Sequence, residues 1–407
     1  MRLPEAPWQK AAAMSRLLAA LDAAKGETRF VGGCVRDTLL GLPVSDVDLA
    51  TRLPPEEVMA RIRKAGLKPI PTGLAHGTVT ALIGKGATVE ITTLRRDVAT
   101  DGRRATIAYT DDWCEDAARR DFTINALSAN PATLEIFDYF DGLVDLAARR
   151  VRFIGDPIRR IAEDHLRILR FFRFHARFGR GAPDPAGLEA CAARAMDLMA
   201  LSRERIADEL LKLLAMDDPA ATVALMLAHG ILAPVLPEID EAGAARLAAL
   251  PPRERAAATP PDPLRRLGAL LPPDPEAAAG IAARLRLSNA ARQRLICIAQ
   301  RREPAPADPA ALAYRIGLPC AIDRLLLNDA LDAAQAAAAV RRLDGWQKPK
   351  LPVTGGMLLA RGLEAGPVVA RTLQAIERDW LEAGFPDGDA FATILETRLG
   401  QALRDSQ

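Results

Sequence analysis

The sequence predicts an α+β fold, with a small mixed sheet in the N-terminal third and helices in the rest of the chain. Short β-type pieces such as TRFVGG, GTVTALIG and ATVEITTL fall between residues 28 and 137, and brief helical stretches separate them. From about Asp156 onward the strand patterns nearly disappear, and Ala/Leu/Arg segments with helical periodicity follow. The 407 residues leave room for roughly two to four domains with cores of their own.

We divide the chain into a sheet-bearing part at 1–150 and two helical parts at 151–250 and 251–407. The proline-rich stretch 251–276 is interpreted as a linker or joint between helical units, because proline and glycine interrupt regular structure. The arginine-rich segment Asp156–Gly179 is predicted to be a helix.

Charge and cysteine content narrow the possible partners and compartments. The chain has 54 Lys and Arg against 52 Asp and Glu, so any nucleic-acid contact must come from local arginine clusters. Aromatic residues make up only 4%, which argues against base stacking as the main recognition mode. Five widely spaced cysteines without a CxxC pattern predict neither a disulfide scaffold nor a structural zinc site. We expect no signal peptide, no membrane span and a cytoplasmic location.

The strongest chemical signal is the pair Asp46 and Asp48 in the segment SDVDLA. Residues at i and i+2 of a strand lie on the same face, so the two carboxylates are expected side by side. Adjacent carboxylates repel each other unless a cation lies between them. The pair therefore predicts a site for Mg²⁺, a cation that prefers oxygen ligands, although DxD alone is also common in solvated turns.

Two glycines ahead of this pair suggest a phosphate site. Gly32 and Gly33 follow an apolar strand and open a helix, where glycine lets the backbone approach an anion closely. Arg36 lies one turn into that helix and could reach a triphosphate oxygen. Asp37 is interpreted as structural, holding an arginine.

A third carboxylate would complete a two-metal site, and two candidates remain open. Glu90 lies in the strand ATVEITTL, and Asp121 lies in the segment RRDFTINAL. Glu90 could instead be an exposed strand residue, and Asp121 a helix cap. In the same segment, Arg119 and Arg120 are candidate phosphate or ribose contacts or plain surface arginines, and Asn125 could bind a sugar or cap local structure.

A run of charged residues in the arginine-rich helix suggests a nucleobase site. Asp164, Arg167, Arg170 and Arg173 recur every three residues, which makes a row that winds around the helix. Asp164 and Arg167 could offer an acceptor and a donor to a base edge. The alternative is an ordinary ion pair within the helix.

Together these motifs resemble the bacterial class II tRNA nucleotidyltransferases, a family of CCA-adding enzymes and related poly(A) polymerases. The matching stretches are GGCVRDTLLGLPVSDVDL, ARRDFTINAL, GDPIRRIAEDHLRILRFFRFHARFG and, more weakly, SRERIADELLKLL. They occur in the family's order and cover about residues 28–215. The resemblance implies a polymerase-β-like nucleotidyltransferase head followed by a helical neck, body and tail that hold tRNA.

The resemblance also implies roles for the candidate residues. Asp46 and Asp48 would bind Mg²⁺, while Gly33, Arg36 and Arg120 (or Arg119) would contact the triphosphate of CTP or ATP. Asp164 and Arg167 would pair with the incoming base, supported by Arg170 and Arg173. The tRNA 3′-hydroxyl would attack the α-phosphate, adding C, C and A without a template and releasing pyrophosphate.

Two alternatives to CCA addition remain. One is a poly(A) or A-adding polymerase of the same family, and the other is a non-catalytic RNA-binding protein. The stretch PTGLAHGTVTALIG lacks the basic GRRF-type pattern of the poly(A) polymerases. The segment 94–116 is predicted to be a long loop whose Arg103–Arg104 pair helps the change from CTP to ATP. Both features favour full CCA addition.

Overall fold

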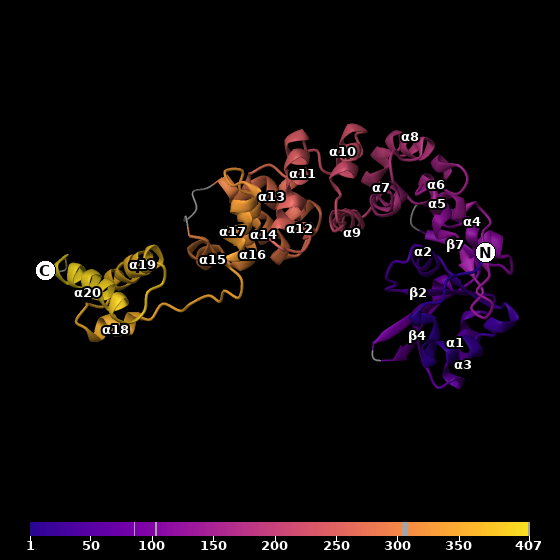
Figure 1. Ribbon diagram of the computed structural model, residues 1–407, viewed down its shortest axis with the longest axis horizontal. Coiled ribbons are helices and arrows are strands. Elements are labelled where there is room, and N and C mark those ends of the chain that lie inside the picture. The colour runs from indigo at the N-terminus through magenta and orange to yellow at the C-terminus, as the bar shows by residue number, and fades with distance from the viewer. Residues whose placement is uncertain (85, 102–103, 303–307, 406–407) are drawn as a thin grey trace. The chain divides into compact units, whose positions relative to one another are not determined.

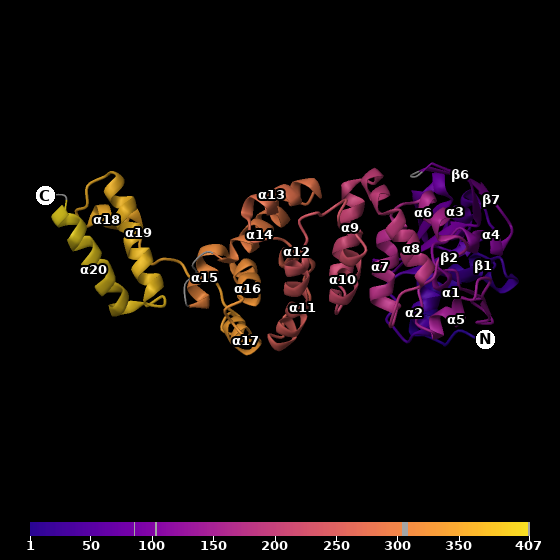
Figure 2. The same ribbon diagram turned by 90° about the horizontal axis from the view of Figure 1, so that it is seen from above.

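The computed structural model describes residues 1–84, 86–101, 104–302 and 308–405, and it divides into two compact units (Figures 1 and 2). The first unit is Met1–Pro237 and the second is Glu238–Gln407. The first holds the sheet with the helices that follow it, and the second is helical. The predicted order, a small mixed sheet followed by helices, is confirmed.

A seven-stranded sheet forms the centre of the first unit, with strand order β3-β4-β5-β2-β1-β8-β9. Within it, β2 and β5 pair in parallel and the other neighbours pair antiparallel. Its strands are β1 (Thr28–Val31), β2 (Val47–Thr51), β3 (Lys68–Gly73), β4 (Thr78–Gly84), β5 (Ala87–Thr93), β8 (Ser128–Ala129) and β9 (Ile136–Phe137). The parallel pair matters for function because it sets Asp48 directly opposite Glu90.

Short helices surround this sheet: α1 (Ala12–Ala20), α2 (Gly33–Leu39), α3 (Pro55–Lys64), α4 (Trp113–Ala118) and α5 (Gly142–Ala147). Helix α2 packs against β1 and β2, and α3 packs against β3, β4 and β5. Alternate strand residues such as Phe30, Leu49 and Ile91 are buried in the core, as the period of two requires. The opposite face of β2 and β5 is therefore left for polar residues.

The segment predicted as a long loop is a β-hairpin instead. Strands β6 (Arg95–Asp101) and β7 (Arg104–Tyr109) pair antiparallel as a separate two-stranded sheet. The two strands are rich in charged residues and show little alternation of polar and apolar residues, so the sequence pattern alone does not indicate the hairpin. Arg103 lies outside the described residues, so the role predicted for the Arg103–Arg104 pair stays a prediction.

Five helices complete the first unit: α6 (Pro157–Glu163), α7 (Arg167–Phe178), α8 (Pro185–Ala193), α9 (Arg203–Leu214) and α10 (Ala220–Ala228). Figure 2 shows α9 and α10 beside α7, where they pack. The prediction of one helix through Asp156–Gly179 is wrong, because the chain turns at Asp164. Its backbone is extended, with φ of −154°, and its carboxylate accepts a hydrogen bond from the Leu166 amide at 3.1 Å.

The second unit is built from helices, several of which begin with an aspartate followed by a proline. They are α11 (Glu241–Ala256), α12 (Pro263–Leu270), α13 (Pro275–Arg284), α14 (Asn289–Ala299), α15 (Pro309–Ile316), α16 (Leu318–Leu326), α17 (Ala333–Arg341), α18 (Gly355–Ala360), α19 (Pro367–Glu382) and α20 (Gly388–Asp405). In α12, α13 and α15 an aspartate caps the helix and a proline occupies its first position, where no amide donor is needed.

These starts explain why the linker interpretation of 251–276 is wrong. Pro263 and Pro275 begin helices, and Pro251 and Pro252 lie inside α11. The division between the two compact units falls earlier, between Pro237 and Glu238.

A buried cluster of charges joins four helices of the second unit. Asp323 on α16 is fully buried and accepts hydrogen bonds from Arg265 on α12 and Arg294 on α14, at 2.7–2.9 Å. Glu254 on α11 is also buried and accepts from Arg265 and Arg266. Buried charges need such partners, so each carboxylate holds several helices in place.

The second unit also contains a disulfide between Cys297 on α14 and Cys320 on α16. The five widely spaced cysteines predict no disulfide scaffold, but this one disulfide is present. It forms because α14 and α16 pack against each other and bring the two cysteines together. Cys34, Cys114 and Cys191 are free. Within the described residues, no helix combines the length and the apolar character needed to cross a membrane.

Candidate active site

A polar cavity of about 650 Å³ lies between the sheet and helix α7, within the first unit. It contains twelve of the fourteen predicted site residues, and Glu90 and Arg119 are the two that do not line it. Seven arginines line it: Arg36, Arg120, Arg167, Arg170, Arg173, Arg177 and Arg205. Five aspartates balance them in part: Asp37, Asp46, Asp48, Asp121 and Asp164. A cavity so rich in arginine suits a polyanionic ligand.

The turn between β1 and α2 shows why glycine occupies position 32. Gly32 has φ of +70°, a conformation that side chains other than glycine rarely adopt. A Cβ atom there would lie 2.9 Å from Nη1 of Arg120. The missing side chain therefore lets Arg120 lie directly against the turn at the cavity wall.

Asp48 lies close to other carboxylates. It is paired in register with Glu90 on β5, and Asp46 lies two residues earlier, just before β2 begins at Val47. Burial raises the pKa of Asp48 to about 6, and the charges of Glu90 and Asp46 add to this, while Arg120 opposes it. Among the described residues no three His, Cys, Asp or Glu side chains form a ready metal site. Two carboxylates with a third next to them still fit a divalent cation that also binds substrate phosphates.

The raised pKa gives a stability prediction for Asp48→Asn. The folded pKa of Asp48 lies above its usual value, so its contribution to stability is favourable at low pH and is lost as pH rises through about 6. With metal removed by EDTA, Asp48→Asn should stabilise the protein at about pH 7.5 by about 1–3 kcal/mol, and by almost nothing near pH 4. Urea unfolding at both pH values measures this, and equal effects at both would contradict it.

Asp121, one of the two candidates for the third carboxylate, lines the cavity but already has several hydrogen-bond donors. It is buried and accepts hydrogen bonds from Arg170, from the Asn125 side chain at 2.9 Å and from the Phe122 amide at 2.8 Å. Burial works against ionisation, but the Arg170 guanidinium and these donors hold the pKa of Asp121 below its usual range. Its role is to orient Arg170 and Asn125.

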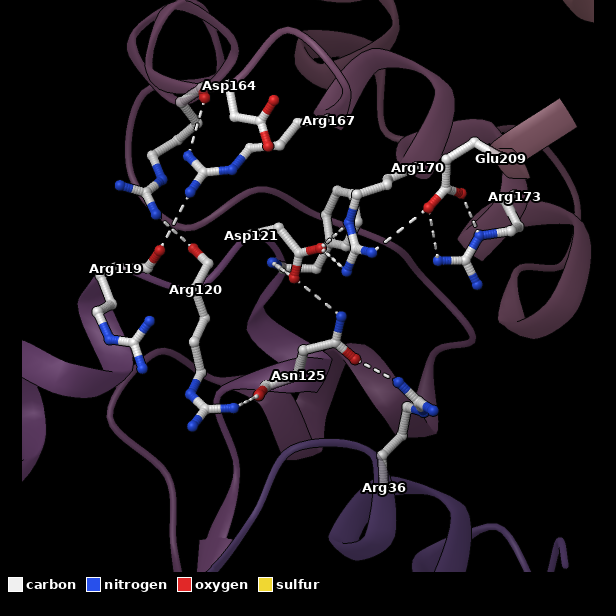
Figure 3. A network of polar contacts seen from close by, with 12 residues as sticks. Arg36, Arg119, Arg120, Asp121, Asn125, Asp164, Arg167, Arg170, Arg173 and Glu209 are labelled. Carbon is white, nitrogen blue, oxygen red and sulfur yellow. Dashed lines mark hydrogen bonds and ion pairs between the residues drawn. The ribbon is translucent and has the colours of Figure 1, made fainter. Parts of the chain in front are cut away.

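A continuous polar network runs from the sheet-bearing part to the helices (Figure 3). Asn125 accepts a hydrogen bond from Arg36, and Asp121 connects Asn125 to Arg170 on α7. Glu209 on α9 in turn contacts Arg170 and Arg173. In Figure 3 each of these side chains points toward the next one in the network. The network fixes the arginines that face the cavity.

Asp37 holds two arginines, which confirms its structural interpretation. It forms an ion pair with Arg36 at 2.7 Å and a longer one with Arg177 at 3.3 Å. Arg36 is buried and lies over the ring of Phe178, with the guanidinium carbon 4.1 Å from the ring centroid.

Asp164 and Arg167 both face the cavity but form no ion pair with each other. Asp164 accepts two hydrogen bonds from Arg205 of α9, at 2.8 and 3.0 Å. Arg167 contacts Glu163 and donates to the carbonyl oxygens of Arg160 and Arg119. The alternative of an ion pair within one helix is therefore wrong, and each side chain is held by other elements.

Arg119 and Arg120 take different directions. Arg119 pairs with Asp116 at 2.8 Å and does not line the cavity. Arg120 lines the cavity, and donates to the Asn125 carbonyl at 3.4 Å. Of the two predicted candidates, Arg120 is the one placed to contact a ligand.

Comparison with known proteins adds to this geometry. The family described as Poly A polymerase head domain matches residues 28–152, and the probable RNA and SrmB-binding site of polymerase A matches residues 182–242. The mouse protein named CCA tRNA nucleotidyltransferase 1, mitochondrial, is 33% identical over 371 residues, which cover 88% of this chain and 84% of that protein. The chain belongs to the CCA tRNA nucleotidyltransferase family.

Two further relatives support membership of this family. The human protein of the same name is 47% identical over 192 residues, 46% of this chain, and that match spans only 44% of its own length. The crystal structure of the Bacillus stearothermophilus CCA-adding enzyme in complex with CTP is 26% identical, with a TM-score of 0.75. The superposition covers 97% of this chain and 99% of that one.

Three charged residues of the cavity or network were not predicted: Arg177, Arg205 and Glu209. Arg177 continues the arginine row of α7, one turn beyond Arg173. Arg205 and Glu209 lie in SRERIADELLKLL, four residues apart and so on one helix face. The four-residue spacing of Arg205 and Glu209 is the sequence pattern that could have identified them.

Proposed function

We propose that this protein adds C, C and A to the 3′ end of tRNA from CTP and ATP, without a template and with release of pyrophosphate. The observation that carries the proposal is the shared cavity, where Asp46 and Asp48 face the same space as Asp164 and Arg167. Asp46 and Asp48 suit a metal ion at the reacting phosphate, and Asp164 and Arg167 suit hydrogen bonds to the edge of a base. Both members of each pair lie in the first unit.

We propose Mg²⁺ as the divalent cation, held by Asp46 and Asp48 with Glu90 as the third carboxylate. Glu90 is favoured over Asp121 because Asp121 is occupied by Arg170 and Asn125, whereas Glu90 is exposed beside Asp48. Bound there, the cation would polarise the α-phosphate and lower the pKa of the attacking hydroxyl. Arg120, beside the glycine turn, would orient the triphosphate.

Asp164→Ala should blur the choice between CTP and ATP. The Asp164 carboxylate, oriented by Arg205, would accept a hydrogen bond from the amino group of the incoming base while Arg167 donates to a ring acceptor, and at each addition this pair of contacts would fit the correct base better than the other. Losing a charged hydrogen bond should lower discrimination against the wrong nucleotide by about 10–100-fold. Steady-state incorporation of CTP and ATP into tRNA ending in the first or second C measures this. Asp208→Ala is the control, since Asp208 is exposed, pairs with Lys212 and does not line the cavity. An unchanged CTP-to-ATP ratio in Asp164→Ala would remove the base-reading role.

One incubation separates the candidate functions. The protein is mixed with tRNA lacking its 3′ end, Mg²⁺ and labelled CTP or ATP, and the products are sized. Extension that stops after C, C and A supports the proposal, and a long A tail supports a poly(A) polymerase. The absence of any extension would support a non-catalytic RNA-binding protein. The carboxylates around Asp48 count against that last possibility, because an RNA-binding protein has no use for mutually repelling anions.

We propose that the sheet-bearing head ends near residue 150, that 151–250 selects the base and contacts RNA, and that 251–407 binds tRNA. The placement of Asp164, Arg167 and Arg205 in the middle part supports this division. We also propose a cytoplasmic location. The three free cysteines fit a reducing compartment, whereas the Cys297–Cys320 disulfide does not, so alkylation of thiols in intact cells provides the test.

A further inference from the structure

The arginines of the cavity differ in how fully their partners hold them. The Arg36, Arg167 and Arg173 side chains are only 6–13% exposed, and each has strong ion pairs or hydrogen bonds. Arg177 has the highest exposed fraction among the cavity arginines of the described chain, at 38%. Its ion pair is a single 3.3 Å contact with Asp37.

The position of Arg177 points to a phosphate. Asp37, which holds it, is on α2, the helix that follows the glycine turn at Gly32 and Gly33. Asp37 also binds Arg36, so one negative charge faces two positive charges. Burial lowers the pKa of Arg36, and the neighbouring charge of Arg177 contributes in the same direction. An anion placed between the two guanidinium groups would relieve that repulsion.

The geometry of α7 agrees with this position. Arg167 and Arg177 are ten residues apart, which corresponds to about 15 Å along the helix axis. Arg170 and Arg177 are seven residues apart and so lie on the same helix face. A nucleotide with its base at Arg167 and its phosphates toward the far end of α7 would reach Arg177.

We propose that Arg177 binds the terminal phosphate of the incoming nucleoside triphosphate, and that Arg36 is a buried support for it. The inference rests on the proposed function, because it assumes a nucleoside triphosphate in this cavity. Asp37 keeps Arg177 at the cavity wall through a weak contact. On binding, the phosphate oxygens replace that contact with shorter, charge-assisted hydrogen bonds.

The test uses Arg177→Gln in the full chain, with inorganic tripolyphosphate as the probe and calorimetry as the readout. We expect tripolyphosphate affinity to fall at least about tenfold, and Arg177→Lys to recover part of it because the charge remains. The KM values for CTP and ATP should rise by the same factor, with the CTP-to-ATP ratio and the KM for tRNA unchanged. Arg159→Gln is the matched control, since Arg159 is 85% exposed and lies outside the cavity.

Several results would overturn the assignment. Unchanged tripolyphosphate affinity in Arg177→Gln would do so, as would failure of the unaltered protein to bind tripolyphosphate. A raised KM for tRNA alone would assign Arg177 to the RNA backbone instead. A lower melting temperature with unchanged affinity would show a merely structural role. Because tripolyphosphate binding needs no turnover, a protein that binds it through Arg177 but adds no nucleotide would refute the proposed function and leave this contact intact.

Discussion

Asp48→Ala should reduce nucleotide incorporation by at least about 10²–10³-fold, the scale expected when a preorganised electrostatic group is removed from a reacting centre. Asp48 lies opposite Glu90 and two residues after Asp46, and burial and these neighbouring charges raise its pKa, so a bound cation would favour its ionised form. Removing it would leave the proposed cation with only Asp46 and Glu90 as carboxylate ligands. Incorporation of labelled CTP at saturating Mg²⁺ measures the loss.

The matched control for Asp48→Ala is Asp111→Ala, an exposed aspartate of the same unit that does not line the cavity. Its activity should equal that of the unaltered protein. Binding of tRNA should remain nearly normal in Asp48→Ala, because backbone contacts by arginines elsewhere dominate affinity for RNA. If Asp48→Ala still turned over at a comparable rate, the metal assignment would be wrong.

Asp323→Ala should be the most destabilising single change in the second unit, at about 3–5 kcal/mol. The fully buried Asp323 carboxylate joins Arg265 and Arg294, so its loss leaves two arginines without their shared anion. The Cys297–Cys320 disulfide holds the same pair of helices, α14 and α16, so the experiment is done in reductant. Hydrogen exchange of peptides from α12, α14 and α16, followed by mass spectrometry, locates the effect.

An exposed ion pair of the same unit gives the comparison for Asp323→Ala. Arg361 and Glu396 pair on the surface, and Glu396→Ala should change stability by less than about 1 kcal/mol. Nucleotide binding should be retained in both variants, because the cavity lies in the first unit. Equal hydrogen exchange in Asp323→Ala and Glu396→Ala would show that the buried cluster contributes little.

The sequence predicted the parts of the fold that local patterns control. Alternating apolar residues marked the strands around Asp48, and the glycines at 32 and 33 marked the turn before α2. The break at Asp164 could not be predicted, because helical periodicity continues through it and one of the contacts of Asp164 comes from Arg205 on another helix. The disulfide could not be predicted either, because the packing of α14 against α16 brings its cysteines together.

The candidate site shows the same limit. Motifs identified the side chains that face the cavity, but not which partners they have. From the sequence, Asp121 is as good a candidate metal ligand as Glu90. Only the tertiary structure shows that its carboxylate accepts hydrogen bonds from Arg170 and Asn125. Glu209 gave no signal on its own, because its function depends on two arginines that lie more than thirty residues earlier.

The state of the cysteines gives this protein a natural position for a spectroscopic label. Burial raises the pKa of Cys34 to about 12 and also raises that of Cys191, so neither thiol reacts readily. Cys297 and Cys320 are consumed by their disulfide. Cys114 is free and partly exposed on α4, which packs against β6 of the hairpin. A maleimide dye on the oxidised, unmutated chain should therefore attach at Cys114 and follow movements of the hairpin while nucleotides bind.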